Sequence, residues 1–294
     1  MPTPPSYHSY TGHAENPLTP DEWNKMRAAV IESATRHMVG RRIIDVYGPL
    51  GPGVQSLPFE QFADASLGTV DLIGEKSEGA VVAESRRFKP IPMIHKDFVL
   101  HWRDLEASRG GAFPLDVSAA AGAASLVARA EDRLIFFGNA ELGYDGLMNA
   151  QGRSHVEMRS WERTGGGFEN VVEALEVLLA HGHYGPYAMA ASPKRFAQLH
   201  RVYEKTGVLE IDSIKKVVTE GIFQSTVLTG DQAVVIAVGS EHFDLAVSVD
   251  VDLAYLGAEK MNHPFRVLEC VALRIKHPDA ICTFEAGPQR RGKG

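Results

Sequence analysis

Two short stretches of the sequence carry residue types that bind ligands in other proteins. Gly165-Gly166-Gly167 precedes a predicted helix, where backbone N–H groups could cradle a phosphate. The run lacks the Lys-Ser/Thr of a P-loop and the dinucleotide fingerprint, so we favour a flexible linker. His181-Gly182-His183 offers two potential metal ligands, but no Cys or carboxylate stands at ligand spacing. We therefore interpret this stretch as a polar helix end.

Glu131 and Asp132 are adjacent acidic residues inside another predicted helix. Neighbouring positions on a helix diverge by about 100°, so the two carboxylates do not form an acid/base pair. Arg129 and Arg133 flank them, which favours ion pairing within or between chains and makes this turn a candidate interface. The sequence also contains no G-x-S-x-G elbow and no HExxH motif. We therefore predict no enzyme, no catalytic residue, no metal and no cofactor.

The bulk properties are those of a globular protein of 294 residues with a formal net charge of −7. This charge disfavours a nucleic-acid partner, which requires a basic surface. Neither a signal peptide nor an apolar stretch long enough to cross a bilayer is found, so we expect a cytoplasmic protein with no membrane partner. Cys270 and Cys282 are too few for a disulfide framework, and we expect two buried thiols.

Two helices dominate the pattern of apolar residues. Thr19 to Glu22 form a capping box that opens the first helix, which we expect to end at Gly40. The second, from Pro114 to Gly138, is the predicted central spine, with Asp116 as N-cap. The apolar stripes at helical spacing are Trp23, Met26, Val30, Ala34 and Met38 in the first helix, and Ala119, Ala123, Leu126, Ala130, Leu134 and Phe137 in the second.

The remaining elements place the chain in the α+β class, because no βαβ unit repeats. Thr69–Ile73 and Ala80–Arg86 are predicted to form a hairpin joined by residues 74–79, which needs another surface to lie on. Residues 1–17 are expected to be an extended or disordered arm. Further predicted strands and helices are Arg41–Val46, Ile94–Leu100, Tyr187–Ala191, Ala233–Val238, Phe243–Val249 and Phe265–Ile275, and Phe168–Ala180 and Pro193–Glu204.

Five segments together carry a family resemblance: LTPDEW, VGRRIIDVYGP, ARAEDRLIFFG, YGPYAMA and FDLAVSVDVDLAYLG. Their order and spacing from Leu18 to Phe284 resemble the family 1 encapsulins, also called linocin-like proteins, whose protomers have the HK97-type capsid fold. The resemblance implies a P-domain, an A-domain and an extended E-loop. It implies these divisions: 1–17 N-terminal arm, 18–52 P-domain, 53–89 E-loop, 90–140 P-domain with the spine helix, 141–239 A-domain, 240–287 P-domain strands and 288–294 tail.

The resemblance also implies two sites. A cargo-docking groove on the lumenal face would accept an extended terminal peptide of the cargo at Ala34, Met38, Arg41, Asp45, Asp250 and Val251. A fivefold pore loop would consist of Tyr203, Glu204, Lys205, Thr206, Gly207 and Val208. Some members bind a flavin against a Trp near the base of the E-loop. In this sequence Trp102 falls one position early, and Arg103 stands where the resemblance implies the Trp. On an extended strand, a shift of one residue turns the ring to the opposite face. We therefore predict no flavin.

The function implied by the resemblance is that of a non-enzymatic shell subunit. Copies of the chain would form a large icosahedral homo-oligomer, a nanocompartment around a cargo enzyme. The expected cargo is a ferritin-like iron oxidase or a dye-decolourising peroxidase, linked to iron storage or oxidative-stress defence. The alternatives are a prophage major capsid protein of the same fold and, in another class, a soluble hydrolase or bacteriocin-like protein.

Overall fold

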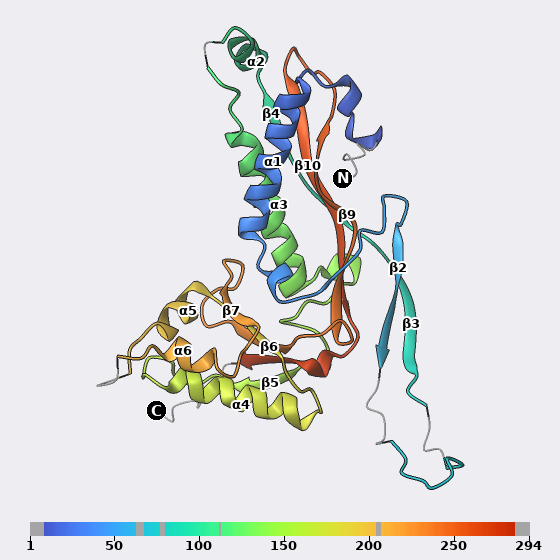
Figure 1. Ribbon diagram of the computed structural model, residues 1–294, viewed down its shortest axis with the longest axis vertical. Coiled ribbons are helices and arrows are strands. Elements are labelled where there is room, and N and C mark those ends of the chain that lie inside the picture. Colours follow the sequence, from blue (N-terminus) through green and yellow to red (C-terminus); the bar gives the residue numbers. More distant parts are fainter. Residues whose placement is uncertain (1–8, 63–67, 77–79, 112, 204–206, 286–294) are drawn as a thin grey trace, which may run out of the picture.

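The computed structural model describes residues 9–62, 68–76, 80–111, 113–203 and 207–285. Within them the chain forms a four-stranded sheet, a five-stranded sheet and a separate two-stranded hairpin (Figure 1). Helices lie on both larger sheets, and no regular βαβ repeat occurs in these residues. The predicted α+β class is confirmed.

The four-stranded sheet forms the long, upper part of the molecule and carries two long helices on one face (Figure 1). Its two central strands, β9 and β10, are 13 residues each and pair antiparallel. The helices lie side by side against them. The sheet order is β1 (Val46–Tyr47), β9 (Phe243–Tyr255), β10 (His263–Ile275) and β4 (Met93–Leu100), and the helices are α1 (Pro20–His37) and α3 (Ser118–Phe137).

The start and buried face of α1 are as predicted from the sequence. The Thr19 side chain accepts from the Glu22 N–H, and the Glu22 carboxylate accepts from the Thr19 N–H, which together form a complete capping box. The predicted apolar stripe is buried. The helix ends at His37, three residues before the predicted stop, because Gly40 already begins a 3-10 turn, η3 (Gly40–Arg42), in place of the predicted strand at Arg41–Val46.

The helix α3 is the predicted spine, but its buried face is rotated from the expected one. Gly138 ends it as predicted, whereas Val117 is the N-cap and Asp116 only accepts from the Ser118 N–H at 2.9 Å. Small residues surround most of this helix, so apolar periodicity alone gave the wrong phase. Ala119, Leu126 and Ala130 are exposed, and the buried face consists of Ala120, Ala123, Ala124, Val127, Ala128, Glu131, Asp132, Leu134, Ile135 and Phe136.

The spine connects two hydrophobic clusters. Its first half packs with α1, β4 and the upper parts of β9 and β10, and its last turn belongs to a second cluster that contains the lower parts of β9 and β10 and the five-stranded sheet. Both cysteines are free, Cys282 buried and Cys270 half-buried. None of the helices in the described part of the chain combines the length and apolarity needed to span a bilayer.

The five-stranded sheet and three helices form the lower part of the molecule (Figure 1). Its strand β11 corrects the expected division, because residues 240–287 were assigned to one unit with the long strands. After β10 the chain turns through η5 (Pro278–Ala280), and β11 is buried between β5 and β8. The elements are β5 (Ser154–Glu157), β11 (Ile281–Glu285), β8 (Ala233–Ala237), β6 (Tyr187–Ala191) and β7 (Gly221–Gln224), with α4 (Gly166–Ala180), α5 (Pro193–Leu199) and α6 (Glu210–Ile214).

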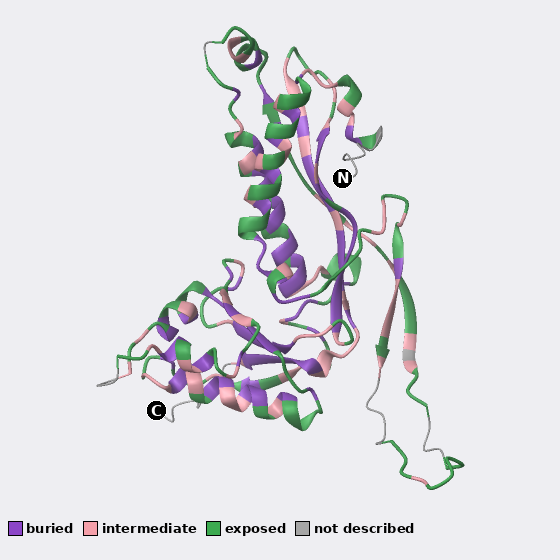
Figure 2. Ribbon diagram, in the orientation of Figure 1, coloured by how far each residue is buried: buried purple, intermediate pink, exposed green. Residues whose placement is uncertain are grey.

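The hairpin extends away from the body of the chain and is largely exposed (Figure 2). It pairs β2 (Ser56–Phe62) with β3 (Ala83–Pro90). The predicted first strand, Thr69–Ile73, is wrong: those residues lie near the tip, outside any strand, and Val70 and Leu72 are fully exposed. Apolar, β-branched residues there resemble a strand in composition, but within the described residues none of 68–76 or 80–82 pairs in a strand. Residues 77–79 of the predicted turn lie outside the described part.

Two further segments differ from the sequence prediction. Residues 9–15 form short turns, η1 (Ser9–Thr11) and η2 (His13–Glu15), instead of a disordered arm. Thr11 is buried, and the His13 ring packs edge-on against Trp23 at 4.8 Å. The charged stretch before the spine forms a helix, α2 (Trp102–Arg109), that was not predicted.

Candidate functional site

A groove of about 420 Å³ lies between α1 and β9, and it brings together most residues of the predicted docking site. Five of the six predicted residues line it, and Asp45 does not. Sequence reasoning missed four others, all on α1 or the turn after it. The lining residues are Arg27, Ile31, Ala34, Thr35, Met38, Arg41, Arg42, Asp250 and Val251.

Strand register explains why Asp45 lies elsewhere. The next residue, Val46, pairs with Leu245 on β9, five residues before Asp250. At about 3.3 Å per residue, that separation is roughly 16 Å along the strand. Asp45 therefore belongs to another part of the surface.

The groove combines an apolar floor with a charged rim. Ala34, Met38 and Val251 are buried beneath it, whereas Ile31 is 38% exposed at its edge. Ile31 precedes Ala34 by three positions on the same helix, and this helical spacing is the signal that could have identified it. The arrangement can hold an apolar side chain of an extended segment.

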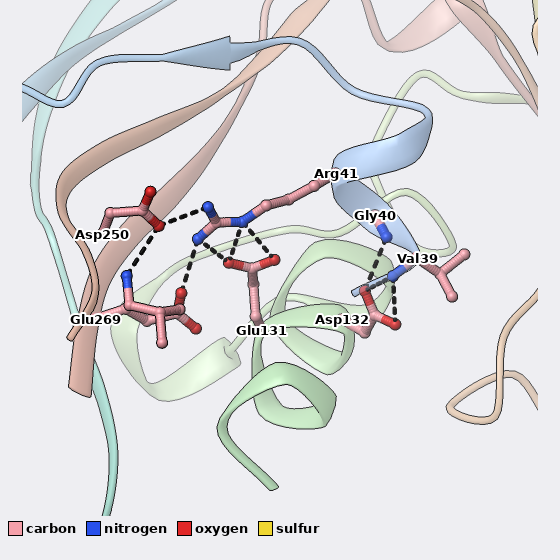
Figure 3. Close-up of polar contacts among 8 residues, drawn as sticks. Val39, Gly40, Arg41, Glu131, Asp132, Asp250 and Glu269 are labelled. Carbon is pink, nitrogen blue, oxygen red and sulfur yellow. Dashed lines mark hydrogen bonds and ion pairs between the residues drawn. The ribbon is translucent and has the colours of Figure 1, made fainter. Parts of the chain in front are cut away.

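Arg41 is the main charged group of the groove wall, and all three nitrogens of its guanidinium donate to carboxylates of the chain (Figure 3). Nε donates to both oxygens of Glu131 at 3.0 and 2.8 Å, and Nη2 bonds Glu131 at 2.6 Å and Glu269 at 2.8 Å. Nη1 donates to Asp250 at 2.7 Å. Both glutamates are fully buried. Arg41 therefore joins η3, α3, β9 and β10 in a single polar cluster.

The surroundings of Arg41 and Glu269 shift the pKa values of these two groups. Burial opposes the charge of Arg41, but the hydrogen bond and attraction of Glu131, with Glu269 and Asp250, outweigh it and raise the pKa of Arg41. Burial and the neighbouring Glu131 raise the pKa of Glu269 well above its ordinary value. One guanidinium faces three carboxylates here, so like charge adds to burial in opposing the ionisation of Glu269.

Asp132 has a structural role that corrects its interpretation as part of an interface. It is buried, and its carboxylate accepts from the Val39 N–H at 3.0 and 3.1 Å and from the Gly40 N–H at 2.8 Å (Figure 3). Burial raises the pKa of Asp132 to about 7, although these hydrogen bonds oppose the shift. Glu131 and Asp132 thus hold the turn after α1 onto the spine. Only the neighbouring arginines, which are exposed, remain candidate contact residues.

The glycine run at the start of α4 allows close packing and is not the flexible linker that we favoured. A Cβ on Gly166 would lie 2.3 Å from the Ser160 carbonyl oxygen, and one on Gly167 would lie 2.5 Å from Leu199. The helix N-terminus is already occupied by a buried carboxylate, because Glu210 accepts from the Phe168 N–H at 2.8 Å. A phosphate has no place there.

The two histidines at the end of α4 have different environments. His181 is exposed, as expected for a polar helix end, but His183 is buried and contacts Asp279 at 2.7 Å. Within the residues that the structure describes, no group of three or more His, Cys, Asp or Glu side chains is placed to hold a metal ion.

The predicted pore loop is described only at its ends. Glu204, Lys205 and Thr206 lie outside the described residues. The Tyr203 N–H donates to the Val208 carbonyl at 2.9 Å, and the flanking residues 202 and 209 form an antiparallel bridge. Gly207 has a φ of 72°, which favours glycine. The two sides of this loop are therefore held together at its base.

The geometry at Trp102 removes one premise of the flavin prediction. We argued from an extended strand, but Trp102 is the first residue of α2, and the Arg103 guanidinium lies over its ring at 5.4 Å. A one-residue shift on a helix rotates a side chain by about 100°, not to the opposite face. The prediction that no flavin binds therefore loses its geometric argument and stays untested.

Comparisons with known proteins agree along nearly the whole chain. A family profile described as "Encapsulating protein for peroxidase" matches residues 9–272. The type 1 encapsulin shell protein EncA of Myxococcus xanthus is 56% identical over 96% of this chain and 99% of its own length. A diheme-cytochrome-encapsulin shell fusion protein of Kuenenia stuttgartiensis is 44% identical over 91% of this chain and 74% of its own. A ferritin-like-encapsulin shell fusion protein of Pyrococcus furiosus is 26% identical over 90% and 68%.

Solved structures show the same architecture at low sequence identity. A virus-like particle from Pyrococcus furiosus matches with a TM-score of 0.73 at 24% identity, covering 90% of this chain and all of its own. The capsid of Myoviridae phage XM1 matches with a TM-score of 0.60 at 10% identity, covering 84% and 90%. These likenesses concern the fold alone, and they confirm the HK97-type capsid fold that the resemblance implied.

Proposed function

This chain belongs to the encapsulin family of shell proteins, and we propose that its copies assemble into a closed icosahedral compartment around a cargo protein. The observation that carries this proposal is the 56% identity to a type 1 shell protein over almost the full length of both chains. The chain itself is structural in this proposal and catalyses no reaction. We place the compartment in the cytoplasm.

The cargo that we propose is an iron- or redox-active protein. The description of the matching family names a peroxidase as what is encapsulated. One relative is a fusion with a diheme cytochrome, and another is a fusion with a ferritin-like protein. These relatives support the expected ferritin-like iron oxidase or dye-decolourising peroxidase. A link to iron storage or oxidative-stress defence follows from either cargo.

The prophage alternative has less support. The phage capsid match rests on 10% identity, which speaks for the fold and not for the role. The shell-protein match is far higher, at 56% identity. The hydrolase alternative has no supporting observation among the described residues.

Docking in this proposal uses the groove between α1 and β9. An extended cargo tail places an apolar side chain over Ala34, Met38 and Val251. Arg41 acts as a structural support of the groove wall, because its donors are engaged by carboxylates of the chain. Asp250, whose side chain is 62% exposed, is the charged residue available to fix the direction of the tail.

The pore loop at 203–208 and the hairpin have roles in the assembled shell. We propose that the loop lines a small opening at the fivefold axis and that the hairpin lies on a neighbouring subunit. The exposure of the hairpin in the single chain supports the second role (Figure 2).

Electron microscopy and mass photometry of the purified protein test the assembly. We expect closed, uniform particles of many subunits at micromolar concentration. A protein that stays monomeric or dimeric under these conditions would contradict the proposal.

An Ile31→Asp variant tests the docking groove. Ile31 is partly exposed, so the substitution should cost little folding stability while placing a carboxylate in the groove. Losing about 1–2 kcal/mol of apolar contact weakens binding roughly tenfold. The measurement is the cargo-to-shell ratio, by mass spectrometry, in shells isolated from the source cells.

The matched control is Lys25→Asp, on the same helix but outside the groove. We expect this variant to retain the cargo load of the unmodified shell. An equal cargo load in Ile31→Asp and Lys25→Asp would argue against docking at this groove.

A further inference from the structure

Three histidine rings from distant parts of the sequence meet at one point of the fold. His183 follows α4, His242 precedes β9 and His277 follows β10. The ring centroids of His183 and His242 are 4.8 Å apart at an interplanar angle of 89°, and those of His242 and His277 are 5.9 Å apart at 90°. His183 and His277 lie 6.1 Å apart. Each ring therefore packs edge-on against the other two.

This histidine cluster, His183, His242 and His277, joins the three parts of the molecule. His183 belongs to the unit of the five-stranded sheet, and the other two stand at the lower ends of the long strands. The hairpin reaches it through Phe62, whose ring stacks on His277 at 5.7 Å and 17°. Backbone bonds complete the junction: the Phe62 N–H donates to the Lys276 carbonyl at 3.2 Å, and the Lys276 and His277 N–H groups donate to the His242 carbonyl.

The carboxylates that face this cluster can balance fewer charges than its three rings can carry. Asp279 contacts His183 at 2.7 Å and lies 3.9 Å from His277. Glu241 lies 3.7 Å from His242, but its side chain is 68% exposed, so solvent screens it. Asp244 is already shared by Arg274 and Lys276, which add positive charge beside the cluster. Asp279 can balance one positive charge, but each ring lies within about 6 Å of the other two, so a second charge in the cluster would meet like charge.

Burial of the rings increases the cost of this charge imbalance, because solvent cannot screen it. His183 is 8% exposed and the His242 side chain 12%. His242 Nδ1 is buried and has no hydrogen-bond partner among the described residues. Burial and the neighbouring His183 lower the pKa of His242, and Glu241 opposes them. The folded protein therefore accepts a proton at His242 less readily than an unfolded chain does.

We propose that the histidine cluster is a pH-sensitive latch, which holds the hairpin and the five-stranded sheet in place at neutral pH and loosens on acidification. A shell whose hairpins contact neighbouring subunits then weakens at its subunit contacts in an acidic environment. The local contacts of the latch lie within one chain, so the inference stands apart from the choice of cargo and from the docking groove.

The direction of the pH effect follows from proton binding. Because the pKa of His242 in the folded protein lies below its unfolded value near 6.5, the unfolded state binds more protons as the pH falls. The contribution of His242 is therefore fully present above about pH 6.5 and is lost on acidification towards the lower folded pKa. Each proton taken up on opening changes the opening equilibrium by up to about tenfold per pH unit.

Hydrogen-exchange mass spectrometry of the assembled shell at pH 7.5 and 5.5, corrected for the intrinsic exchange rate, tests the latch. We expect the amides of Phe62, Lys276 and His277 to lose protection by about tenfold at the lower pH. The amides in the middle of β9 and β10 should keep theirs. An unmodified shell that shows no such local loss overturns the proposal.

Three variants separate the cluster from other titrating groups. His242→Gln and His277→Gln remove one imidazole each, and we expect both to flatten the pH response at the latch. His181→Gln is the matched control, because His181 is exposed, lies two residues from His183 and is outside the cluster. It should respond like the unmodified shell.

If His242→Gln fails to fold, the pH response of His277→Gln tests the proposal instead. The His277 side chain is 28% exposed, so this position should tolerate the amide of glutamine. A full pH response in the folded His-to-Gln variants of the cluster overturns the proposal. A flattened response in His181→Gln overturns it as well, because the effect would not be specific to the three rings.

Discussion

One guanidinium holds together four separate elements beneath the groove. Arg41 is 16% exposed, and the two glutamates that it contacts have no exposed side-chain surface. A buried ion pair contributes little net stability compared with an apolar replacement, but a buried charge that has lost its partner is costly. Substitutions of Arg41 are therefore expected to cost more folding stability than substitutions of the apolar groove residues.

Arg41→Met is expected to destabilise the protein by about 3–5 kcal/mol, because Glu131 and Glu269 stay buried without their cation. Arg41→Lys keeps the charge but loses the planar fork, and it should recover only part of the loss. Denaturant unfolding of each variant at one protein concentration measures the effect. Arg36→Met, at an exposed arginine of α1, is the matched control. Equal unfolding curves for Arg41→Met and Arg36→Met would disprove this role.

The spine helix shows how one element serves two purposes on adjacent residues. At its charged turn, Glu131 and Asp132 face inward and fasten the segment after α1, while Arg129 is exposed. Within this turn, Glu131 and Asp132 therefore support the fold, and Arg129 lies on the surface. We therefore expect a charge reversal at Arg129 to impair assembly more than folding, and a charge reversal at Asp132 to impair folding itself.

Asp132→Lys should abolish soluble folded protein, because it buries an ammonium and leaves the Val39 and Gly40 N–H groups without their acceptor. Arg129→Glu should change the free energy of unfolding by no more than about 0.5 kcal/mol, as is usual at exposed sites. Soluble yield and circular dichroism distinguish the two variants, and light scattering reports assembly. Soluble, intact shells of Asp132→Lys would show that its buried contacts are dispensable.

On the scale of the whole molecule, the tip of the hairpin lies uncovered on the single chain. The hairpin tip exposes Val70 and Leu72 completely, and Ile73 is 74% exposed. An isolated two-stranded ribbon is marginal in water, so a surface outside the chain is expected to cover it. A neighbouring copy is the partner that the proposed shell supplies.

Leu72→Asp should therefore leave the fold of the chain unchanged while lowering the yield of closed shells. The residue contacts little within the chain, so its loss costs little folding stability. Mass photometry measures the shell fraction, and the thermal unfolding midpoint measures the fold. Lys76→Asp adds a carboxylate to the same hairpin without removing apolar surface, and it should assemble normally. A normal shell yield from Leu72→Asp would mean that the tip is not an assembly contact.

Local patterns in the sequence were sufficient for the features that depend on neighbouring residues. The capping box at Thr19, the buried stripe of α1, the end of the spine at Gly138 and the strand Tyr187–Ala191 are all found where they were predicted. Caps, helical periodicity and short apolar runs act within a few residues, so one segment contains the whole signal. The family resemblance then supplied the capsid-type fold, because it drew on motifs spread over most of the chain.

Features that depend on contacts between distant residues could be determined only from the tertiary structure. From the sequence, Glu131 and Asp132 were interpreted as part of a charged turn and a candidate interface. In the fold they are buried, Glu131 against Arg41, which also bonds Glu269, and Asp132 against the Val39 N–H. Pairing between separate segments likewise decides two strand positions. It places β11 in the five-stranded sheet, and it makes Ser56–Phe62 the first strand of the hairpin. Burial and strand pairing are properties of contacts between segments far apart in the chain, and spacing within one segment carries no information about them.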